Sequence, residues 1–574
     1  MFNAIDSAGV FGVEGTRISV EVDICNGLPQ VNIVGLADLA IRESVERVRA
    51  AIKNSGFSFP MERITVNLAP ADLRKEGTAF DLAIAAGILT ASGQIARDLF
   101  HNTLVIGELS LNGGLRPVPG VLAMIQHAKE RGITSVLLPL DNCREAGWIS
   151  GMELFGLSHL KQLQAGKNKE GVLRDDLKVD PVNGELDDHT IAMHSLSPDG
   201  SGTNHEKNGV LSCAKNTGNE NNELAEIHPY PSSDQAISDT GAVWGERPLP
   251  DFADIIGQQH AKRALLIAAA GRHNILFSGP PGTGKTMMIQ ALPGILPLLD
   301  ENEALEVTKI YSVAGKLPAN AKGLIRTPPF RSPHHSVSTA GLIGGGTMPK
   351  PGELTLAHRG ILYLDELTEF PRSVLDMLRQ PLENSVITIS RAKATVQFPA
   401  SIMLAASFNP CPCGYYGHEY GGNYCTCSST AISRYRSRLS GPLLDRIDLQ
   451  LEVPRPRSNE HTQRSRPPGS AELRGVVEAA RERQRQRNGT VGVYCNSELA
   501  GAALRKTARL RRDASMLLEQ AFQSLGISMR AYDRLLKLSR TIADVEASEY
   551  IEAEHIAEAI QYRRTDASVV SSST

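Results

Sequence analysis

The sequence predicts a multidomain α/β protein: an N-terminal α+β domain, an α/β core built around a glycine-rich loop, and an all-α C-terminal segment. Three observations support this order. Residues 17–24 alternate apolar and polar side chains as a half-buried strand does, and residues 38–55 carry apolar side chains at helical spacing. An apolar run at 275–278 enters a glycine-rich turn that a helix-like stretch follows. Successive helical patterns without intervening strands occupy 511–525, 529–546 and 553–563.

Length and composition narrow the class of protein. A chain of 574 residues has room for about three to four domains. With 41% hydrophobic residues, 21% charged residues and a net charge of −3, it is typical of a globular protein and not of a uniformly basic nucleic-acid coat. The N-terminus lacks a basic or apolar signal region and no apolar run approaches the length of a membrane span, so we expect a cytoplasmic protein without a membrane partner.

Residues 1–165 are expected to form the α+β domain. After the first strand and helix, residues 64–68 are predicted to form a strand, 81–90 a buried helix, and 104–106 and 136–138 two buried strands. Strands and helices alternate without long gaps, which favours a single compact unit.

The next segment, residues 166–247, has a different composition. Counted from 166 to 250, the chain holds 15 Asp and Glu against 7 Lys and Arg, a net of −8, and its apolar residues are sparse and aperiodic. Such a segment buries too little apolar surface to offset the entropy cost of ordering it. It is therefore predicted to be an acidic flexible linker.

The core, predicted to span 248–455, contains the pattern G-x-x-x-x-G-K-[ST]. Backbone N–H groups of such a loop close on phosphates, its lysine reaches the β- and γ-phosphates, and its hydroxyl binds Mg²⁺. The pattern predicts an ATP and Mg²⁺ site formed by Gly279, Pro280, Pro281, Gly282, Thr283, Gly284, Lys285 and Thr286.

A second acidic motif supports this site. The apolar run 360–364 ends in Asp365 and Glu366, about 80 residues beyond the glycine-rich loop, as a Walker B strand does. Asp365 is predicted to hold Mg²⁺, directly or through water, and Glu366 to polarise the attacking water.

Three further residues resemble parts of AAA+ ATPases. The apolar strand 402–408 ends in Asn409, which resembles sensor 1, a polar residue that orients the water or the γ-phosphate. Arg446 resembles the arginine finger, which reaches the nucleotide of a neighbouring subunit, although a surface ion pair with Asp445 or Asp448 is the alternative. Arg530 resembles the sensor 2 arginine of a helical lid, with Arg534 one turn later as the fallback.

The segment between the two nucleotide motifs is the most family-specific part of the chain. It contains Phe-Arg-Ser-Pro-His-His at 330–335, a Gly-Gly-Gly loop at 344–346, and Pro-Gly-Glu-Leu-Thr-Leu-Ala-His at 351–358. Together with Leu-Tyr-Leu-Asp-Glu at 362–366, these motifs resemble the magnesium-chelatase-like AAA+ ATPases of the YifB/ComM group. The resemblance implies a hexameric DNA-binding motor that drives branch migration during natural transformation.

The N-terminal segment also resembles a known fold. Residues 106–113 and 132–139 are similar to the proteolytic domain of Lon, which has a ribosomal S5 domain 2-like fold. By rough alignment, the serine nucleophile of Lon falls near Thr78 and its lysine near Leu122. A Ser–Lys pair needs an amine to take the hydroxyl proton, and leucine has none. We therefore expect a non-proteolytic Lon-like domain, with an unrecognised peptidase as the alternative.

Four cysteines form a separate candidate metal site. Cys411-Pro-Cys413 and Cys425-Thr-Cys427 are separated by eleven residues that include several glycines. Four thiolates can surround Zn²⁺ tetrahedrally, but the C-x-C spacing is less common than C-x₂-C. The pattern indicates either a structural zinc site or free, redox-active thiols.

Several basic residues are candidate DNA contacts. Arg331, His334, His335 and Lys350 lie in the family-specific segment, although the two histidines suit structural hydrogen bonds as well. In the predicted helical lid, 456–565, residues Arg474, Arg481 and Arg485 recur at helical spacing and suggest a basic stripe, with a solvated helix face as the alternative. The tail 566–574 is predicted to be disordered.

The leading interpretation is an ATP-hydrolysing ring that moves single-stranded and branched DNA in homologous recombination, with a recombinase as a further partner. One alternative is a chelatase-like motor subunit that remodels a protein partner. A protease or unfoldase would require the Ser–Lys pair that the aligned positions lack.

Overall fold

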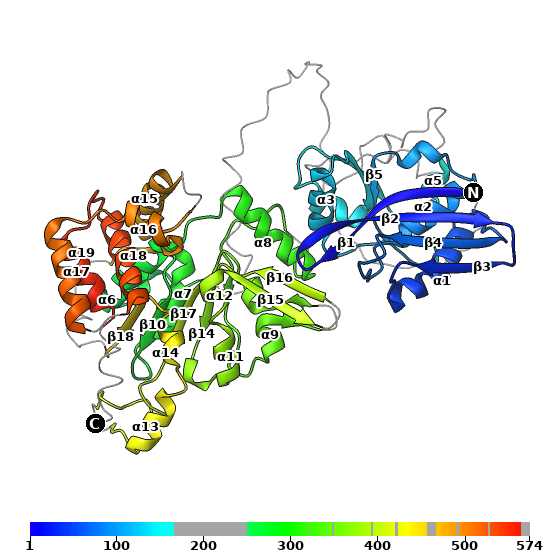
Figure 1. The fold of residues 1–574 in the computed structure, drawn as a ribbon. Coiled ribbons are helices and arrows are strands. Elements are labelled where there is room, and N and C mark those ends of the chain that lie inside the picture. The colour runs from blue at the N-terminus through cyan, green and yellow to red at the C-terminus, as the bar shows by residue number, and fades with distance from the viewer. Residues whose placement is uncertain are drawn as a thin grey trace, which may run out of the picture.

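The computed structural model describes residues 1–165, 249–318, 321–346, 349–391, 394–419, 423–455, 467–489, 493–525 and 528–563. The predicted linker at 166–247 and the predicted tail at 566–574 lie outside these ranges. Figure 1 shows the N-terminal strands at one side of the molecule, the central sheet in the middle and the C-terminal helices at the other side. No helix in the described part of the chain is long and apolar enough to cross a membrane.

The N-terminal residues form a mixed seven-stranded sheet in the order β3-β4-β2-β1-β5-β8-β9. Alternating burial along β2 and β4 shows why these segments are strands: one face of each packs against helices and the other is polar. The helix α2 is buried along its entire length. The elements are β1 (Phe2–Phe11), β2 (Glu14–Cys25), β3 (Gln30–Val34), α1 (Leu39–Asn54), β4 (Arg63–Ala69), α2 (Asp81–Ala91), β5 (Thr103–Val105), α3 (Val121–Glu130), β8 (Ser135–Pro139), α4 (Leu140–Ala146) and β9 (Glu153–Leu157).

The central sheet has five parallel strands in the order β11-β14-β17-β10-β18. Its strands are short apolar runs because both faces are covered by other elements. The carboxyl ends of parallel strands meet at one edge, so the segments that follow β10, β14 and β17 lie close together. The strands are β10 (Ile275–Ser278), β11 (Phe330–Arg331), β14 (Ile361–Leu364), β17 (Met403–Phe408) and β18 (Leu449–Glu452).

Several insertions extend the central sheet. The hairpin of β15 (Val386–Arg391) and β16 (Ala394–Pro399) packs on Val13, which lies in the turn between β1 and β2. Lys309 of α8 (Glu301–Val313) also forms an ion pair with Glu14 at 2.9 Å. The N-terminal sheet therefore contacts the core directly, as the ends of β1 and β16 show in Figure 1.

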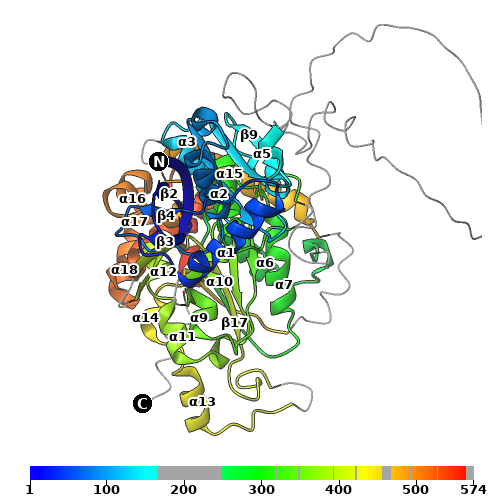
Figure 2. The same ribbon diagram turned by 90° about the vertical axis from the view of Figure 1, so that its right-hand side faces the viewer.

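The remaining elements around the sheet are one longer helix, α6, and several short ones. They are α6 (Gln259–Gly271), α7 (Lys285–Ala291), α9 (Thr339–Ile343), β12 (Gly344–Gly345), β13 (Lys350–Pro351), α10 (Glu353–Leu356), α11 (Arg372–Met377), α12 (Pro381–Asn384), α13 (Ser429–Arg436) and α14 (Gly441–Leu444). In both ribbon views α13 lies at the lower end of the molecule (Figures 1 and 2).

The C-terminal residues are helical, as predicted. They form α15 (Ser470–Asn488), α16 (Gly501–Thr507), α17 (Arg512–Leu525), α18 (Met529–Val545) and α19 (Ala553–Gln561). Apolar residues of α15, α18 and α19 share one buried cluster with those of α6 and β10. The C-terminal helices therefore pack against α6 and β10 of the same chain.

The expected basic stripe on α15 is wrong for two of its three arginines. Arg474 donates to the carbonyl oxygen of Gly294 at 2.7 Å, and Arg481 donates to that of Ala269 at 2.8 Å. The helical repeat that aligns these arginines also aligns them with buried Val477, so this face is turned toward the core. The guanidinium groups satisfy carbonyls at helix ends that lack intrahelical partners. Arg485 is exposed and pairs with Glu482 at 3.4 Å.

Candidate active site

The glycine-rich loop presents Lys285 at the start of α7, directly after the carboxyl end of β10. Gly282 and Gly284 adopt φ values of 76° and 84°, which side-chain-bearing residues rarely accept. The Lys285 ammonium group donates to the carbonyl oxygens of Gly279 and Pro280 at 2.7 and 2.8 Å. Burial lowers the pKa of Lys285, and the nearby Asp365 carboxylate opposes that shift. The loop thus holds a buried amine that is bonded to backbone carbonyl oxygens of the loop itself.

Asp365 follows β14 and contacts residues of two neighbouring segments. It accepts a hydrogen bond from the Thr286 hydroxyl at 3.0 Å and another from the Ser407 hydroxyl. The strand order explains this convergence, because β17 lies between β14 and β10. A hydroxyl and a carboxylate side by side are the oxygen ligands that Mg²⁺ prefers, so Thr286 and Asp365 fit that ion.

Asn409 reaches the same site from the end of β17. Its Oδ1 accepts from the Lys285 ammonium group at 3.3 Å. Ser407 lies two positions earlier on the same strand, and residues at i and i+2 face the same side. That alternation is the sequence signal that would have added Ser407 to the predicted set.

Glu366 is exposed and has φ of 50°. Its carboxylate lies 3.7 Å from Nδ1 of His335, and the ring centroids of His334 and His335 are 4.0 Å apart. His335 follows β11, at the same edge of the sheet as Glu366. The structure therefore places His335 beside the predicted water-polarising residue, a position that sequence reasoning missed when it offered this histidine as a DNA contact.

Arg331 is not available as a DNA contact. Its guanidinium group donates two hydrogen bonds, at 2.6 and 2.9 Å, to the carboxylate of Glu353, and both side chains are largely buried. The pair of Arg331 and Glu353 could not be inferred from spacing, because the two residues are 22 positions apart and meet only when the segment between them folds. Of the other two candidates, His334 is exposed and bonded to Ser336 at 2.8 Å, and Lys350 is exposed.

The two predicted arginines meet away from the glycine-rich loop. Arg446 and Arg530 both pair with Glu383, which lies in α12; Arg530 does so at 3.4 Å. The carbonyl oxygen of Arg446 accepts from the side chain of Asn274, the residue before β10. Arg446 therefore lies at the amino edge of the sheet, whereas Lys285 lies at its carboxyl edge.

The fallback residue Arg534 has a different role. It pairs with buried Asp448 at 3.1 Å, and His273 and the backbone N–H of Asn274 contact the same carboxylate. Burial acts to raise the pKa of Asp448, but Arg534 and His273 hold it well below its usual range. This buried pair joins α18 to the start of β18, so Arg534 is a structural residue.

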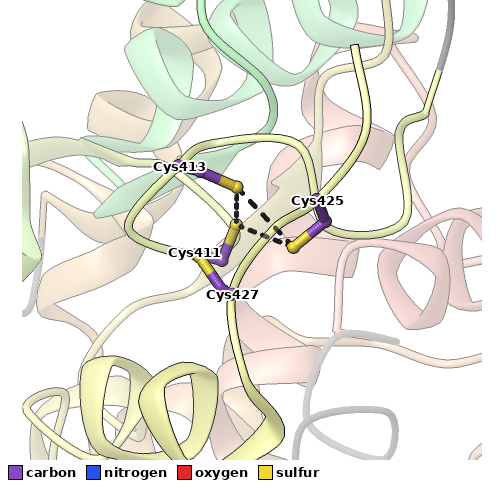
Figure 3. A group of neighbouring side chains, drawn as sticks. All are labelled: Cys411, Cys413, Cys425 and Cys427. Carbon is purple, nitrogen blue, oxygen red and sulfur yellow. Dashed lines mark hydrogen bonds between the residues drawn. The ribbon is translucent and has the colours of Figure 1, made fainter. Parts of the chain in front are cut away.

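The four cysteines come together, as Figure 3 shows. The Sγ atoms of Cys411, Cys413 and Cys425 are separated by 3.2, 3.7 and 3.6 Å. All four Sγ atoms, including that of Cys427, lie within 4.8 Å of one another. Each cysteine is a free thiol, and a four-sulfur set fits a tetrahedral metal ion.

Three family models together match most of the chain. The family model described as "Magnesium chelatase, subunit ChlI" matches residues 251–461, "Subunit ChlI of Mg-chelatase" matches 20–142, and its C-terminal model matches 468–563. The chain is 39% identical to "Competence protein ComM" of Haemophilus influenzae over 558 residues, which cover 97% of this chain and 96% of the relative. The chain belongs to the ComM/YifB family of magnesium-chelatase-like proteins.

Other ComM/YifB relatives match equally completely. "Uncharacterized protein YifB" of Escherichia coli is 38% identical over 573 residues, 98% of this chain and 97% of the relative. The "Magnesium-chelatase 38 kDa subunit" of Rhodobacter capsulatus is more distant, at 28% identity over 232 residues, 37% of this chain and 59% of that protein. The resemblance inferred from the sequence motifs is confirmed, and the mixed α/β fold with a parallel sheet agrees with it.

Proposed function

We propose that the chain is an ATP-hydrolysing AAA+ motor that assembles into a ring and drives branch migration of DNA. In this proposal residues 1–165 form a non-proteolytic Lon-like domain, 248–455 the ATPase core and 456–565 a helical lid. The observation that carries it is the convergence of Lys285, Asp365 and Asn409 at one edge of the central sheet.

Each residue of this group has a distinct role in the proposal. Lys285 and the backbone N–H groups of the non-proline residues in 279–286 bind the phosphates of ATP. Thr286 and Asp365 hold Mg²⁺, which neutralises charge on the transferring phosphoryl group. Asn409 orients the γ-phosphate or the attacking water. Glu366 orients and polarises that water from its exposed position after β14.

The placement of Arg446 supports a ring. The strand β10 separates Asn274, which contacts Arg446, from Gly279, which contacts Lys285. Five steps along a strand span about 16 Å, more than an arginine side chain can reach. Arg446 therefore has no access to the phosphates held by its own chain, and a neighbouring subunit is the partner that fits. Arg530 shares Glu383 with Arg446 and would serve the same neighbour.

The choice of DNA as substrate is supported by the family. A nearly full-length relative is named a competence protein, and the sequence motifs resemble a group of branch-migration motors. Similarity to the magnesium-chelatase subunit covers only part of either chain, which supports the alternative of a protein-remodelling motor less well. A homohexamer, a recombinase partner and a cytoplasmic site of action remain parts of the proposal.

The test compares the wild-type protein with Lys285→Ala and Glu366→Gln. ATP binding, ATP hydrolysis and movement of a labelled four-way DNA junction are measured for each. We expect wild-type protein to hydrolyse ATP and move the junction, Lys285→Ala to lose nucleotide binding, and Glu366→Gln to bind ATP without turnover. Hydrolysis without junction movement would contradict the DNA substrate, and turnover by Glu366→Gln would contradict its assigned role.

A further inference from the structure

We propose that Cys411, Cys413, Cys425 and Cys427 bind one Zn²⁺ ion and that the resulting metal-bound loop holds the glycine-rich loop in its nucleotide-binding position. The first part stands on the cysteines alone. The second part rests on the proposed ATPase function, since it assigns the metal a role in nucleotide affinity.

The sulfur positions fit a tetrahedral metal. Zinc–sulfur bonds of about 2.3 Å place the sulfurs of a tetrahedron about 3.8 Å apart. The separations among Cys411, Cys413 and Cys425 are 3.2, 3.7 and 3.6 Å, which is much longer than a disulfide bond. Four protein thiolates leave no open position for substrate, so the site is structural and not catalytic.

The surroundings of the cysteines suit the charge of such a site. Binding converts four S–H groups into four S–Zn bonds and releases four protons to solvent, which leaves a net charge of −2. The backbone N–H of Tyr416 donates to Sγ of Cys411 at 3.4 Å, the kind of contact that stabilises a metal-bound thiolate. The Arg436 guanidinium lies 5.0 Å from the centre of the Tyr416 ring and donates to the carbonyl of Pro410 at 3.1 Å. A cation is therefore fixed beside the cluster.

The cysteine loop also contacts the nucleotide site. Gly414, directly after Cys413, has φ of 86° and lies so close to the glycine-rich loop that an added Cβ would be 2.8 Å from Cδ of Pro281. The same Cβ would be 4.0 Å from Cγ of Asn409, the residue that bonds Lys285. At the other side of the loop, His418 contacts Glu452 of β18 at 2.9 Å. The cysteine loop thus contacts Pro281 of the glycine-rich loop at one end and Glu452 of β18, the strand beside β10, at the other.

In this arrangement the metal would fix the cysteine loop against the glycine-rich loop, a role that we call the brace. Of the four cysteines only Cys411 is buried, so the two C-x-C segments make little apolar contact that would hold them together without a metal. With the metal, the turn that carries Gly414 is fixed against Pro281. The position of the glycine-rich loop and of Asn409 then depends on occupancy of the four thiolates.

The metal is tested first, without reference to ATP. Purified full-length protein is assayed for zinc, and a cobalt-loaded sample is examined for the near-ultraviolet charge-transfer bands and visible d–d bands of a tetrathiolate site. We expect about one zinc per chain, loss of zinc in Cys425→Ser/Cys427→Ser, and full zinc in the control Cys25→Ser, whose thiol is exposed and remote in sequence from the cluster. Zinc far below one per chain in wild-type protein would overturn the site, whatever the ATPase activity.

The brace is tested with two glycine variants. Gly414→Ala keeps all four cysteines but drives a Cβ into Pro281, whereas Gly417→Ala carries a similar backbone penalty, at φ of 75°, with nothing within 4 Å of its Cβ. We expect both variants to keep zinc and Gly414→Ala alone to weaken binding of a non-hydrolysable ATP analogue, by about tenfold. Equal affinities in the two variants would overturn the brace.

Removal of the metal from wild-type protein gives an independent measure that does not depend on a variant folding. Chelation should lower affinity for the ATP analogue to a similar extent, and added zinc should restore it. Unchanged affinity after complete zinc removal would overturn the brace while leaving the metal site established. Zinc-loaded protein that binds no nucleotide at all would instead contradict the proposed function.

Discussion

If Arg446 acts on a neighbour's nucleotide, two inactive variants should restore activity when mixed. Lys285→Ala removes the amine that we propose binds phosphate, and Arg446→Ala removes the arginine that we propose a neighbouring site needs. Each variant alone is expected to lose at least about a thousandfold in hydrolysis rate, the lower end of the range for an arginine finger. The site formed by a Lys285-intact chain beside an Arg446-intact chain remains complete.

The fraction of the wild-type hydrolysis rate that the mixture should recover follows from how a shared site is built. Arg446 and Lys285 lie at opposite edges of the sheet, so in the proposed ring every active site would join two chains through a head-to-tail interface. In a random equal mixture, a site has an intact Lys285 with probability one half and an intact neighbouring Arg446 with probability one half. About a quarter of the sites should therefore be active. Wild-type protein diluted with Lys285→Ala provides the control for mixing.

The assay is steady-state phosphate release from the two variants, mixed before assembly. Activity near a quarter of the wild-type rate supports a shared site. If Arg446 acted within its own chain, no subunit of the mixture would have a complete site, and the rate would stay at the level of the single variants. That result would refute the shared site and the ring inferred from it.

Three further predictions concern single side chains. His335→Ala should raise the hydrolysis rate measured without DNA by about threefold and leave nucleotide affinity unchanged, since it frees Glu366 from a weak exposed ion pair. Arg331→Ala should lower the free energy of unfolding in urea by about 2 kcal/mol, because it leaves the largely buried Glu353 with the more distant Lys316, at 3.8 Å, as its cationic partner, and should not change DNA affinity. Burial raises the pKa of Asp81 to about 6, so ionisation of this group makes the free energy of unfolding decline as pH rises from about 3.8 through about 6. Asp81→Asn should flatten that decline, by up to about 3 kcal/mol, in thermal unfolding measured across this pH range.

The parts of the candidate site that depend on a local sequence pattern could be predicted. The glycine-rich loop, the acids after β14 and the polar residue after β17 each depend on a local pattern at the end of an apolar strand. The parallel arrangement then brings them together without further information, because the carboxyl ends of such strands share an edge. Lys285, Asp365 and Asn409 therefore meet as expected.

Long-range partners could not be predicted in this way. The helical spacing of Arg481 is visible in the sequence and predicts a basic stripe, but its partner, the carbonyl of Ala269, is set by how α15 packs on α6. Arg331 and Glu353 pair for a similar reason. Glu383, which joins Arg446 to Arg530, belongs to a short helix with no distinctive motif.

Glu383 supplies a physical reason for the proposed shared site. In a single chain, Arg446 and Arg530 have one carboxylate between them, and the arginines lower the pKa of Glu383, Arg446 most strongly. The carboxylate and Arg530 are both well exposed, so the pair that these two form is worth little and is easily replaced. The Arg446 side chain is only 11% exposed and also donates to the carbonyl oxygen of Pro442 at 2.6 Å, so it is held more firmly. A triphosphate presented by a neighbouring subunit offers more negative charge and the bidentate geometry that guanidinium groups prefer. Exchange of Glu383 for phosphate would therefore favour assembly in the presence of ATP, and would position the two arginines only when a neighbour's site is filled.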